Sequence, residues 1–442
     1  MHEAKDNLIV GLGSTGLSVA RYLRARGEVF AVADSRQDPP GLKDLKALSG
    51  EVSVMLGPFD AALFSQYRRL IVSPGISIQE PAIAQAAEAG AEIVGDIELF
   101  ARAARAPVVA ITGSNGKSTV TSLLGHMAAA SGRRVGVGGN LGPPALDLLT
   151  DPEPDLYVLE LSSFQLETTG SLKCAAAAVL NLAEDHLDRY ADMTAYAAAK
   201  QRIFQGAELA VINRDDPWVA SMPGGKQRIS FGLDAPAAGD LGLRHIAGED
   251  WLSVGDQAVM AVSRLLMAGR HNQANALAAL ALARAAGLPM EPCIEALATY
   301  TGLPHRCQFV GRYRGVDWYN DSKGTNLGST LAALAGLPCC VVLIAGGQGK
   351  GQDFSALRPL VADKARGVVL LGQDAGRIEQ ALADAAPVVR VSDMEQAVTE
   401  AARMARRNDS VLLSPACASL DMYRNYEHRG EVFTSAVRRL GA

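Results

Sequence analysis

The sequence predicts an α/β protein of three domains, in which parallel β-sheets are covered by helices. Short apolar runs alternate with helical segments along the 442 residues, as is typical of parallel sheets. Glycine-rich turns follow two of these runs, at residues 11–16 and 113–116, where α/β proteins bind phosphate groups. The length allows about three domains of ~150 residues each.

Residues 1–94 are expected to form a Rossmann-like domain. The expected strands cover residues 8–10, 29–33 and 70–72, and the expected helices cover residues 17–26 and 81–89. The sequence Gly11-Leu-Gly-Ser-Thr-Gly16 joins the first strand to the first helix, and Asp34 closes the second strand. This spacing is typical of a dinucleotide site, and the same geometry holds the diphosphate of a nucleotide sugar, where Arg36 could contact a phosphate. Tight packing of the helix on the sheet, without a ligand, is the third interpretation.

Residues 95–303 are expected to form a central domain around a second phosphate loop. The apolar run Val108–Ile111 ends in Thr112-Gly-Ser-Asn-Gly-Lys-Ser-Thr119, and a helical segment follows. Glycines let several backbone N–H groups point at one anion, and the helix N-terminus adds positive partial charge. Lys117 adds a full charge, and the hydroxyl that follows it can ligate magnesium. The first glycine is two residues closer to the lysine than in the usual G-x-x-x-x-G-K-[ST] pattern, so an ordinary strand-to-helix turn with a surface lysine is the alternative.

Further strands and helices complete the central domain, and residues 304–442 are expected to form a second Rossmann-like domain. In the central domain, strands are expected at residues 156–161, 176–181 and 209–213, small antiparallel strands within residues 228–262, and helices at residues 97–105 and 272–286. In the last domain, strands are expected at residues 339–345, 367–371, 388–391 and 410–413.

Composition and charge exclude several classes of protein. The formal net charge is −5 and no long basic run occurs, which argues against a nucleic-acid partner. The polar N-terminus lacks the apolar core of a signal peptide, and no apolar run approaches the ~18 residues of a membrane span, so no membrane association is expected. The six cysteines form no C-x-x-C pair, which argues against a zinc site or a disulfide framework and fits a cytoplasmic protein.

Three further side chains are candidates for chemistry. Glu160 stands at the end of an apolar strand, where a carboxylate is costly unless it is paired. It is therefore either a magnesium ligand beside the glycine loop or a solvent-exposed residue of an edge strand. His186 follows another strand end and Lys200 lies in a helical stretch. Taken alone, these two residues allow only the ordinary interpretations of a loop histidine and a surface lysine.

Two phosphate-binding loops in one chain limit the classes of reaction that the protein can catalyse. A simple dehydrogenase needs only one nucleotide site. A triphosphate site together with a diphosphate site indicates that ATP drives a reaction on a nucleotide-linked substrate.

Several motifs resemble those of the Mur ligase superfamily, which includes the folylpolyglutamate synthases. They are Thr112–Thr119, Glu160–Gln165, Asn181–His186, Gly269–Asn275 and His305-Arg306, in the expected order. Three C-terminal motifs, at residues 320–326, 346–354 and 414–421, are similar to those of the D-glutamate-adding branch of this family. The likeness covers essentially the whole chain.

The resemblance implies an enzyme, an ATP-dependent acid–D-amino-acid ligase. Such a ligase joins UDP-N-acetylmuramoyl-L-alanine to D-glutamate through an acyl phosphate and releases ADP and phosphate. The reaction belongs to peptidoglycan synthesis, and so to cell wall biogenesis, cell shape, cell division and the cell cycle. Another Mur-type or folylpolyglutamate-type amide ligase is one alternative, and an NAD-dependent dehydrogenase that uses the first loop is another.

The resemblance also assigns residues to each part of the site. The implied catalytic residues are Lys117, Glu160, His186 and Lys200. The implied ATP-binding residues are Gly113, Ser114, Asn115, Gly116, Lys117, Ser118, Thr119, Asn272, Asn275, Arg306 and Asp321. The implied UDP-sugar-binding residues are Gly13, Ser14, Thr15, Gly16, Asp34, Ser35, Arg36, Ser73, Gly75, Asn140 and His186. The implied D-glutamate-binding residues are Lys323, Thr325, Lys350, Ser419, Leu420 and Tyr426.

Two magnesium ions are implied as well, with Ser118, Glu160, His186 and a carbamylated Lys200 as their ligands. Addition of CO₂ would turn the lysine from a cation, which repels a metal ion, into an anion that can hold one. By the same resemblance, residues 1–94 bind the UDP-sugar, residues 95–303 bind ATP and residues 304–442 bind the amino acid. We expect a monomeric, cytoplasmic enzyme whose partners are small-molecule substrates.

Overall fold

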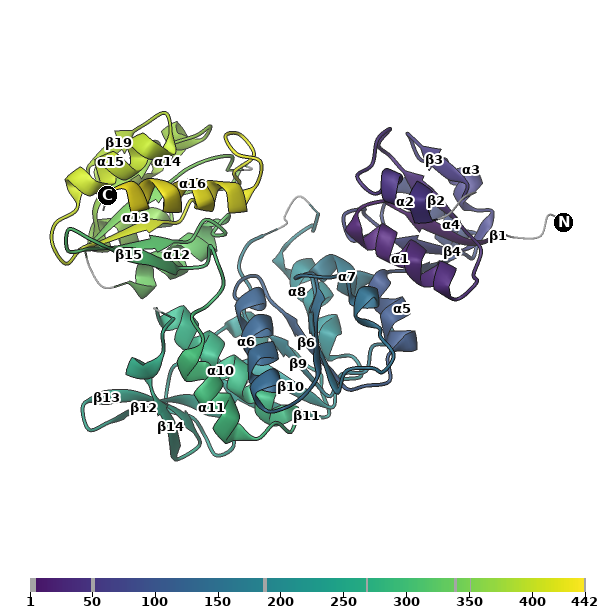
Figure 1. Cartoon of the computed structure of the whole chain (residues 1–442), viewed down its shortest axis with the longest axis horizontal. Coiled ribbons are helices and arrows are strands. Elements are labelled where there is room, and N and C mark those ends of the chain that lie inside the picture. The colour runs from purple at the N-terminus through teal and green to yellow at the C-terminus, as the bar shows by residue number, and fades with distance from the viewer. Residues whose placement is uncertain are drawn as a thin grey trace. The chain divides into compact units, whose positions relative to one another are not determined.

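The computed structural model describes residues 5–48, 52–185, 189–267, 269–337, 340–349 and 351–440. Within them, three β-sheets follow one another along the chain, each accompanied by helices (Figure 1), which confirms the predicted α/β class. The chain forms two compact units, the first made of Met1–Leu182, His186–Phe231 and Ala278–Cys293, the second of Ala183–Asp185, Gly232–Leu277 and Ile294–Ala442. No helix in the described part of the chain is long and apolar enough to cross a membrane.

The first sheet has five parallel strands in the order β3-β2-β1-β4-β5. Its strands are β1 (Lys5–Val10), β2 (Phe30–Asp34), β3 (Val54–Leu56), β4 (Tyr67–Val72) and β5 (Glu92–Val94). Its helices are α1 (Ser14–Ala25), α2 (Leu42–Leu48), α3 (Ala61–Phe64) and α4 (Pro81–Glu88). The strand order reverses between β1 and β4, so the loops after these strands border a crevice at the carboxyl edge of the sheet.

Helix α5 (Asp96–Ala103) follows the first sheet and packs against the second. Its residue Glu98 is buried and accepts hydrogen bonds from the backbone N–H groups of Gly170 and Ser171, at 2.8 and 2.9 Å. These bonds satisfy two donors of a loop that belongs to the central part of the chain. The helix is thereby fixed to residues about 70 positions later in the sequence.

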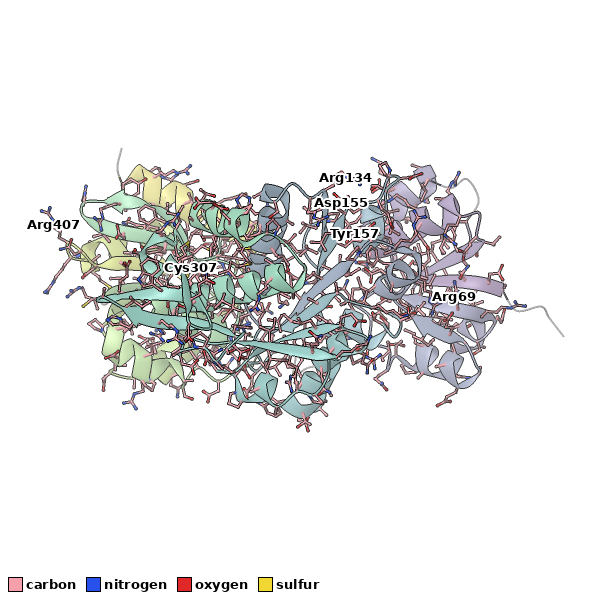
Figure 2. The ribbon with its side chains drawn as sticks, turned by 90° about the horizontal axis from the view of Figure 1, so that it is seen from below. Arg69, Arg134, Asp155, Tyr157, Cys307 and Arg407 are labelled. Atoms are coloured by element: carbon pink, nitrogen blue, oxygen red, sulfur yellow. The ribbon has the colours of Figure 1, made fainter. Side chains whose placement is uncertain are left out.

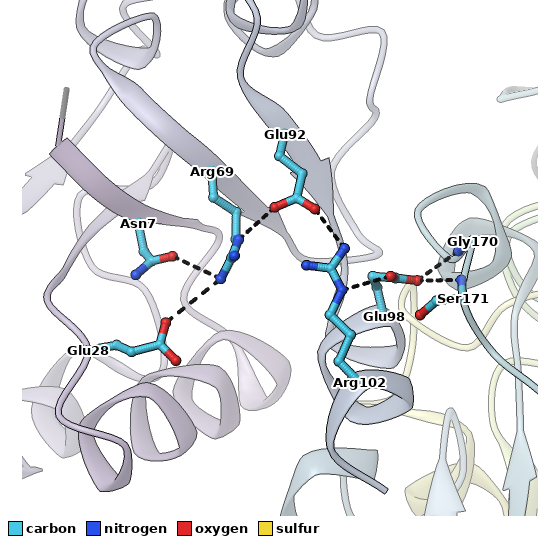
Figure 3. Close-up of polar contacts among 8 residues, drawn as sticks. All are labelled: Asn7, Glu28, Arg69, Glu92, Glu98, Arg102, Gly170 and Ser171. Atoms are coloured by element: carbon cyan, nitrogen blue, oxygen red, sulfur yellow. Dashed lines mark hydrogen bonds and ion pairs between the residues drawn. The ribbon is translucent and has the colours of Figure 1, made fainter.

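A row of alternating charges extends from Glu98 back into the first sheet (Figure 3). Arg102 pairs with Glu98 at 2.9 Å and with Glu92 at 2.6 Å. Arg69 then pairs with Glu92 at 2.8 Å and with Glu28 at 3.7 Å. Each of these partly exposed ion pairs adds less to the stability of the fold than the buried hydrogen bonds of Glu98, because water screens the charges.

Six parallel strands of the second sheet lie in the first unit, in the order β11-β10-β9-β6-β8-β7. They are β6 (Val108–Thr112), β7 (Val135–Gly139), β8 (Leu156–Glu160), β9 (Ala176–Val179), β10 (Leu209–Asn213) and β11 (Gln227–Phe231). The helical segments are α6 (Lys117–Ala130), η1 (Ala145–Leu148), α7 (Ser163–Glu167), α8 (Met193–Gln201), η2 (Arg202–Phe204) and α9 (Pro217–Ala220). Strand β6 is buried between β8 and β9, so its loop lies in the middle of the carboxyl edge.

Tyr157 of β8, labelled in Figure 2, is an example of a core side chain of this sheet. Its ring is buried and meets the ring of Phe100, on α5, edge to face with a centroid distance of 4.9 Å. Arg134 and Asp155, also labelled in Figure 2, form an ion pair of 2.9 Å just before β7 and β8. The aromatic pair stabilises the fold through its buried area and its edge-to-face geometry, whereas the exposed ion pair adds little stability.

Three antiparallel strands follow in the second unit, namely β12 (Leu241–Ile246), β13 (Glu249–Val254) and β14 (Gln257–Ala261). They confirm most of the antiparallel prediction for residues 228–262. The prediction is wrong for residues 228–231, which belong to β11 and run parallel to β10. Strand direction depends on the neighbour that the chain reaches, and a short apolar pattern does not encode that neighbour. The helical segments η3 (Val262–Arg264), α10 (Arg270–Ala285) and α11 (Met290–Thr299) come next.

The third sheet has the order β15-β16-β20-β17-β18-β19, and only its edge strand β15 runs antiparallel to its neighbour among the described strands. Its strands are β15 (Gln308–Tyr313), β16 (Val316–Asn320), β17 (Val341–Ala345), β18 (Ala365–Leu370), β19 (Val388–Arg390) and β20 (Ser410–Leu413). Its helices are α12 (Leu327–Gly336), α13 (Leu357–Lys364), α14 (Ala375–Leu382), α15 (Met394–Met404) and α16 (Tyr426–Arg439). The strand predicted from residue 339 begins at Val341, and Cys339 lies outside the described residues.

Candidate active site

The glycine loop between β6 and α6 is anchored by Asn181, which follows β9. The backbone N–H of Ser114 donates to the carbonyl of Asn181 at 2.9 Å, and the backbone N–H of Asn115 donates to its Oδ1 at 2.8 Å. Asn181 Nδ2 donates back to the Asn115 carbonyl at 3.0 Å. Gly116 has a φ of 82° directly before the helix, a conformation that suits glycine. The loop is thus held in one shape at a helix N-terminus, where the backbone dipoles favour an anion.

The two predicted catalytic lysines meet at this loop. Lys117 is the first residue of α6, and its Nζ donates to the carbonyls of Gly113 and Ser114, both at 2.9 Å. Lys200 of α8 is buried, and its Nζ donates to the same Gly113 carbonyl at 2.9 Å and lies 3.4 Å from Thr112 Oγ1. Lys200 is therefore not the surface lysine that its helical position alone would indicate.

Glu160 ends β8 beside the loop strand and is 2% exposed, so the solvent-exposed alternative is wrong. Its Oε1 accepts a hydrogen bond of 2.6 Å from Asn140 Nδ2. Its Oε2 is buried and has no hydrogen-bond partner among the described residues. Gly139 allows the neighbouring strand end to approach, because a Cβ at this position would lie 2.4 Å from the Glu160 carbonyl oxygen.

The donor set beside the loop fits a magnesium ion. A buried carboxylate oxygen without a partner is costly unless a cation or a donor reaches it. Magnesium prefers carboxylate and hydroxyl oxygens together with substrate phosphates. Ser118, in the first turn of α6, is also buried. Within the described residues, no group of three or more His, Cys, Asp or Glu side chains is placed so that it could hold a metal ion.

Two of the predicted site residues, His186 and Lys350, lie outside the described residues. Of the implied metal ligands, the structure describes Ser118, Glu160 and Lys200, and all three are buried.

A cavity of about 350 Å³ lies at the crevice of the first sheet. It is lined by the loops after β1, β2 and β4, through Gly11, Gly13, Ser14, Thr15, Asp34, Ser35, Arg36, Ser73, Pro74, Gly75 and Ile76. The implied UDP-sugar residues of the first domain are all in this lining except Gly16. A Cβ at Gly16 would lie 1.9 Å from the Gly11 carbonyl oxygen, so this glycine allows α1 to pack closely on the loop. Asn140, implied for the same ligand, contacts Glu160 instead.

Both oxygens of the Asp34 carboxylate, which lines this cavity, accept hydrogen bonds from Leu12 and Arg36. Oδ1 accepts from the backbone N–H and the Nε of Arg36, at 2.9 and 2.8 Å. Oδ2 accepts from the backbone N–H of Leu12 and from Arg36 Nη2, both at 2.7 Å. Burial raises the pKa of Asp34, but these hydrogen bonds and the arginine charge outweigh it and lower the pKa to about 2. The carboxylate therefore shapes the loop and is not free to accept a ribose hydroxyl.

In the second unit, the implied ATP-binding residues Asn272, Asn275 and Asp321 are buried, whereas Arg306 is partly exposed. Asn275 Nδ2 donates to Asn272 Oδ1 at 3.1 Å in the first turns of α10. Asp321 follows β16, and its two oxygens accept from the backbone N–H of Cys307 at 3.1 Å and from Ser414 Oγ at 2.7 Å. Burial raises the pKa of Asp321 to about 7, although these bonds and the charge of Arg306 act in the opposite direction.

Of the implied D-glutamate residues, Lys323, Thr325, Ser419 and Leu420 lie on neighbouring loops of the third sheet, and Tyr426 begins α16. Lys323 Nζ is 3.8 Å from the centroid of the Tyr426 ring, a cation–π distance. The loop of Thr325 and the loop of Ser419 are joined by a hydrogen bond of 2.9 Å between the Ala416 N–H and the Gly324 carbonyl. The implied neighbour Leu420 is 68% exposed.

The sequence assigned no role to two residues that support the glycine loop, Asn181 and Tyr196, although Asn181 begins one of the family motifs. Asn181 anchors the glycine loop, and its position directly after a strand beside the loop strand was a usable signal. Tyr196 lies one helical turn before Lys200, its OH is 3.1 Å from Ser114 Oγ, and its ring centroid is 4.7 Å from Lys200 Nζ. Helical spacing of four residues could have indicated this pair.

Three family models match the chain. They are the Mur ligase MurD-like N-terminal domain at residues 5–95, the Mur ligase middle domain at residues 111–283, and the Mur ligase glutamate ligase domain at residues 305–417. Among curated proteins, the chain is 54% identical to a UDP-N-acetylmuramoylalanine–D-glutamate ligase of Nitrosococcus oceani, over 99% of this chain and 97% of that protein. It is 53% identical to the protein of the same name from Pseudomonas putida, over 97% of this chain and 96% of the relative.

Solved structures with similar folds are also ligases. A crystal structure of MurF from Acinetobacter baumannii has a TM-score of 0.62 at 18% identity and covers 99% of this chain and 92% of its own. UDP-N-acetylmuramate-alanine ligase of Thermotoga maritima has a TM-score of 0.60 at 18% identity and covers 99% of both chains. At these identities the likeness concerns the three-domain fold alone. On the family models and the relatives of more than 50% identity, this chain belongs to the Mur ligase family.

Proposed function

We infer that this chain is an ATP-dependent ligase of peptidoglycan synthesis that forms the amide bond between UDP-N-acetylmuramoyl-L-alanine and D-glutamate. The observation that carries this inference is identity at more than half of the positions, over nearly the whole length, with relatives of that name. The glycine loop with Lys117 and the buried Glu160 supply the ATP chemistry that the reaction needs.

The proposed reaction activates the carboxylate of the UDP-linked substrate, which is a poor electrophile by itself. The carboxylate of the UDP-linked alanine attacks the γ-phosphorus of ATP, the bond to the β-phosphate oxygen breaks, and an acyl phosphate and ADP result. The amine of D-glutamate then attacks the acyl carbon, loses a proton and displaces phosphate, which leaves the amide. Lys117, now held on two loop carbonyls, would move its charge to the phosphates that bind there.

We propose two magnesium ions with distinct ligands from this chain. Ser118 and Glu160 would hold the first, and His186 and a carbamylated Lys200 would hold the second. Magnesium, when bound, would neutralise phosphate charge. The support is the unpartnered Oε2 of Glu160 and the burial of Ser118 and Lys200 at the same sheet edge.

We also propose the division of the substrates among the domains. Residues 1–94 would hold the UDP-sugar in the 350 Å³ cavity, residues 95–303 would hold ATP, and residues 304–442 would hold D-glutamate. The proposed enzyme is a cytoplasmic monomer. Within the described chain, five cysteines are free thiols, which is typical of a reducing compartment.

The dehydrogenase alternative is disfavoured by the geometry of Asp34. A dinucleotide site uses the acid at the end of the second strand to accept a ribose hydroxyl. Here both oxygens of that acid already accept four hydrogen bonds from Leu12 and Arg36. Titration with NADH should therefore give no change in nicotinamide fluorescence.

Phosphate release with each substrate omitted in turn tests the proposal. We expect release only when ATP, magnesium, UDP-N-acetylmuramoyl-L-alanine and D-glutamate are all present. Release that depends on a different amino acid, or on a folate in place of the UDP-sugar, would assign the chain to another amide ligase.

A further inference from the structure

The third domain contains a buried arginine whose charge is not neutralised by a close carboxylate. Arg429, in the first turn of α16, is 2% exposed. Its Nε donates to Ser322 Oγ at 2.9 Å, its Nη2 to the Ser322 carbonyl at 2.7 Å, and its Nη1 to the Cys417 carbonyl at 3.1 Å. All three acceptors are uncharged, and no carboxylate of the described residues forms an ion pair with the guanidinium. Burial lowers the pKa of Arg429 to about 10, which still leaves it a cation at neutral pH.

The acceptors of Arg429 belong to the two loops that carry the proposed D-glutamate residues. Ser322 lies in the turn after β16, directly before Lys323. Cys417 lies in the turn after β20, two residues before Ser419. Strands β16 and β20 are parallel neighbours, so the two turns leave the same edge of the sheet.

Ser322 extends this connection to the helix itself. Its Oγ accepts from Arg429 and donates to the carbonyl of Tyr426 at 2.8 Å. The guanidinium therefore fixes three segments at once, namely the turn that carries Lys323, the turn that carries Ser419, and the helix start that carries Tyr426. Because guanidinium donors have a planar, rigid arrangement, a lysine cannot make the same three contacts.

The charge of Arg429 is also unusual for so buried a position. Burial of an ion is costly unless an opposite charge pairs with it. The acids that act on it from a distance include Asp321 and Asp421. Burial raises the pKa of Asp321 to about 7, which weakens the compensation that this acid offers to the guanidinium at neutral pH. The loops beside Arg429 thus surround one buried positive charge, which Asp421 and Asp321 offset only from a distance and which an anionic ligand would offset further.

We propose that Arg429 is a positioning residue of the amino-acid pocket, which aligns the two loops and biases the pocket toward a substrate with two carboxylates. This inference rests on the proposed D-glutamate pocket. Arg429 itself would act through the loops and through its electrostatic field, without a contact to the substrate.

Replacement of Arg429 by methionine and by lysine tests the proposal in the full-length enzyme. R429M should raise the KM for D-glutamate at least about tenfold, while the KM for ATP changes less than about twofold. R429K keeps the charge but loses the planar contacts, so its KM for D-glutamate should lie between those of the wild type and R429M. The ratio of activity with D-glutamate to activity with neutral D-glutamine should fall at least about tenfold in R429M and less in R429K. Arg438→Met, on an exposed position of the same helix, is the matched control and should match the wild type.

The outcomes separate this proposal from the pocket assignment. A folded R429M with wild-type KM and wild-type preference for D-glutamate would overturn the role of Arg429. If R429M fails to fold, S322A removes one acceptor and should still raise the KM for D-glutamate several-fold, and no change would again overturn the proposal. Lys323→Ala, measured in parallel, should raise the same KM, and its failure to do so would show that the pocket itself is assigned to the wrong loops.

Discussion

Lys117 and Lys200 donate to the same carbonyl oxygen, that of Gly113, each over 2.9 Å. The two nitrogen atoms therefore lie within about 6 Å of each other, a distance at which like charges repel. The loop carbonyls hold both lysines. A bound triphosphate would attract Lys117, and conversion of Lys200 to a carbamate would replace repulsion by attraction.

Removal of the Lys117 charge should abolish turnover. K117A should lower kcat by at least about 10³-fold, because no other charge of the loop can neutralise the developing phosphate charge. Magnesium-dependent ATP binding, measured by calorimetry, should weaken in parallel. Lys173→Ala, at an exposed position of the same unit, is the control and should behave as the wild type. Retention of turnover by K117A would exclude the loop as the ATP site.

Glu160 should control the magnesium requirement. E160Q keeps an acceptor for Asn140 Nδ2 but removes the negative charge of the buried carboxylate. The magnesium concentration for half-maximal activity should rise at least about tenfold. Thermal stability should not fall, because the variant no longer buries an unpartnered charged oxygen. The exposed Glu208→Gln is the control, and an unchanged magnesium dependence of E160Q would remove Glu160 from the metal site.

Lys200 should be carbamylated in the active enzyme. In buffer with ¹³C-bicarbonate, the wild type should show a carbamate carbon signal by NMR that is absent from K200R. Activity of K200R should fall at least about 100-fold, since arginine keeps the positive charge beside Gly113 and cannot form the carbamate. Lys226→Arg, at an exposed position, should keep both the signal and the activity. Full activity of a wild-type sample that lacks the carbamate signal would contradict the prediction.

Glu98 should stabilise the connection between the first and second sheets in a pH-dependent manner. Burial raises its pKa, but hydrogen bonds from Gly170, Ser171 and Arg102 outweigh this and lower the pKa from 4.5 to about 2. Because the folded-state pKa lies below the unfolded value, the ionised carboxylate adds stability above pH 4.5 that is lost as the pH falls toward 2.

The variant E98Q measures this contribution. At pH 7 it should lower the free energy of unfolding by about 2 kcal/mol. The amide lacks the negative charge of the carboxylate and offers one acceptor oxygen instead of two. The difference in Tm between wild type and E98Q should shrink when the measurement is repeated near pH 3. Glu88→Gln, at an exposed helix end, should show little effect at either pH. A difference that stays constant with pH would show that the charge of Glu98 is not the stabilising feature.

Local sequence patterns were sufficient to predict the strands and helices around the phosphate loops. The run Val108–Ile111 and the glycines after it specify strand, turn and helix through neighbours only a few residues apart, and the structure has β6 and α6 there. The same holds for the Gly11–Gly16 loop, of which Gly13, Ser14 and Thr15 line the cavity of the first sheet. The direction of β11 was not predictable in this way, since it depends on the partner strand β10.

By itself, the sequence determined the α/β class, the two phosphate loops and the family, because local spacing and motif order encode them. Only the tertiary structure decided that Glu160 is buried with an unpartnered oxygen and that Lys117 and Lys200 share one carbonyl. It alone placed Arg429 against Ser322, 107 positions away in the chain. Burial and electrostatic partners arise from contacts between segments distant in sequence, and no local pattern specifies which segments those are.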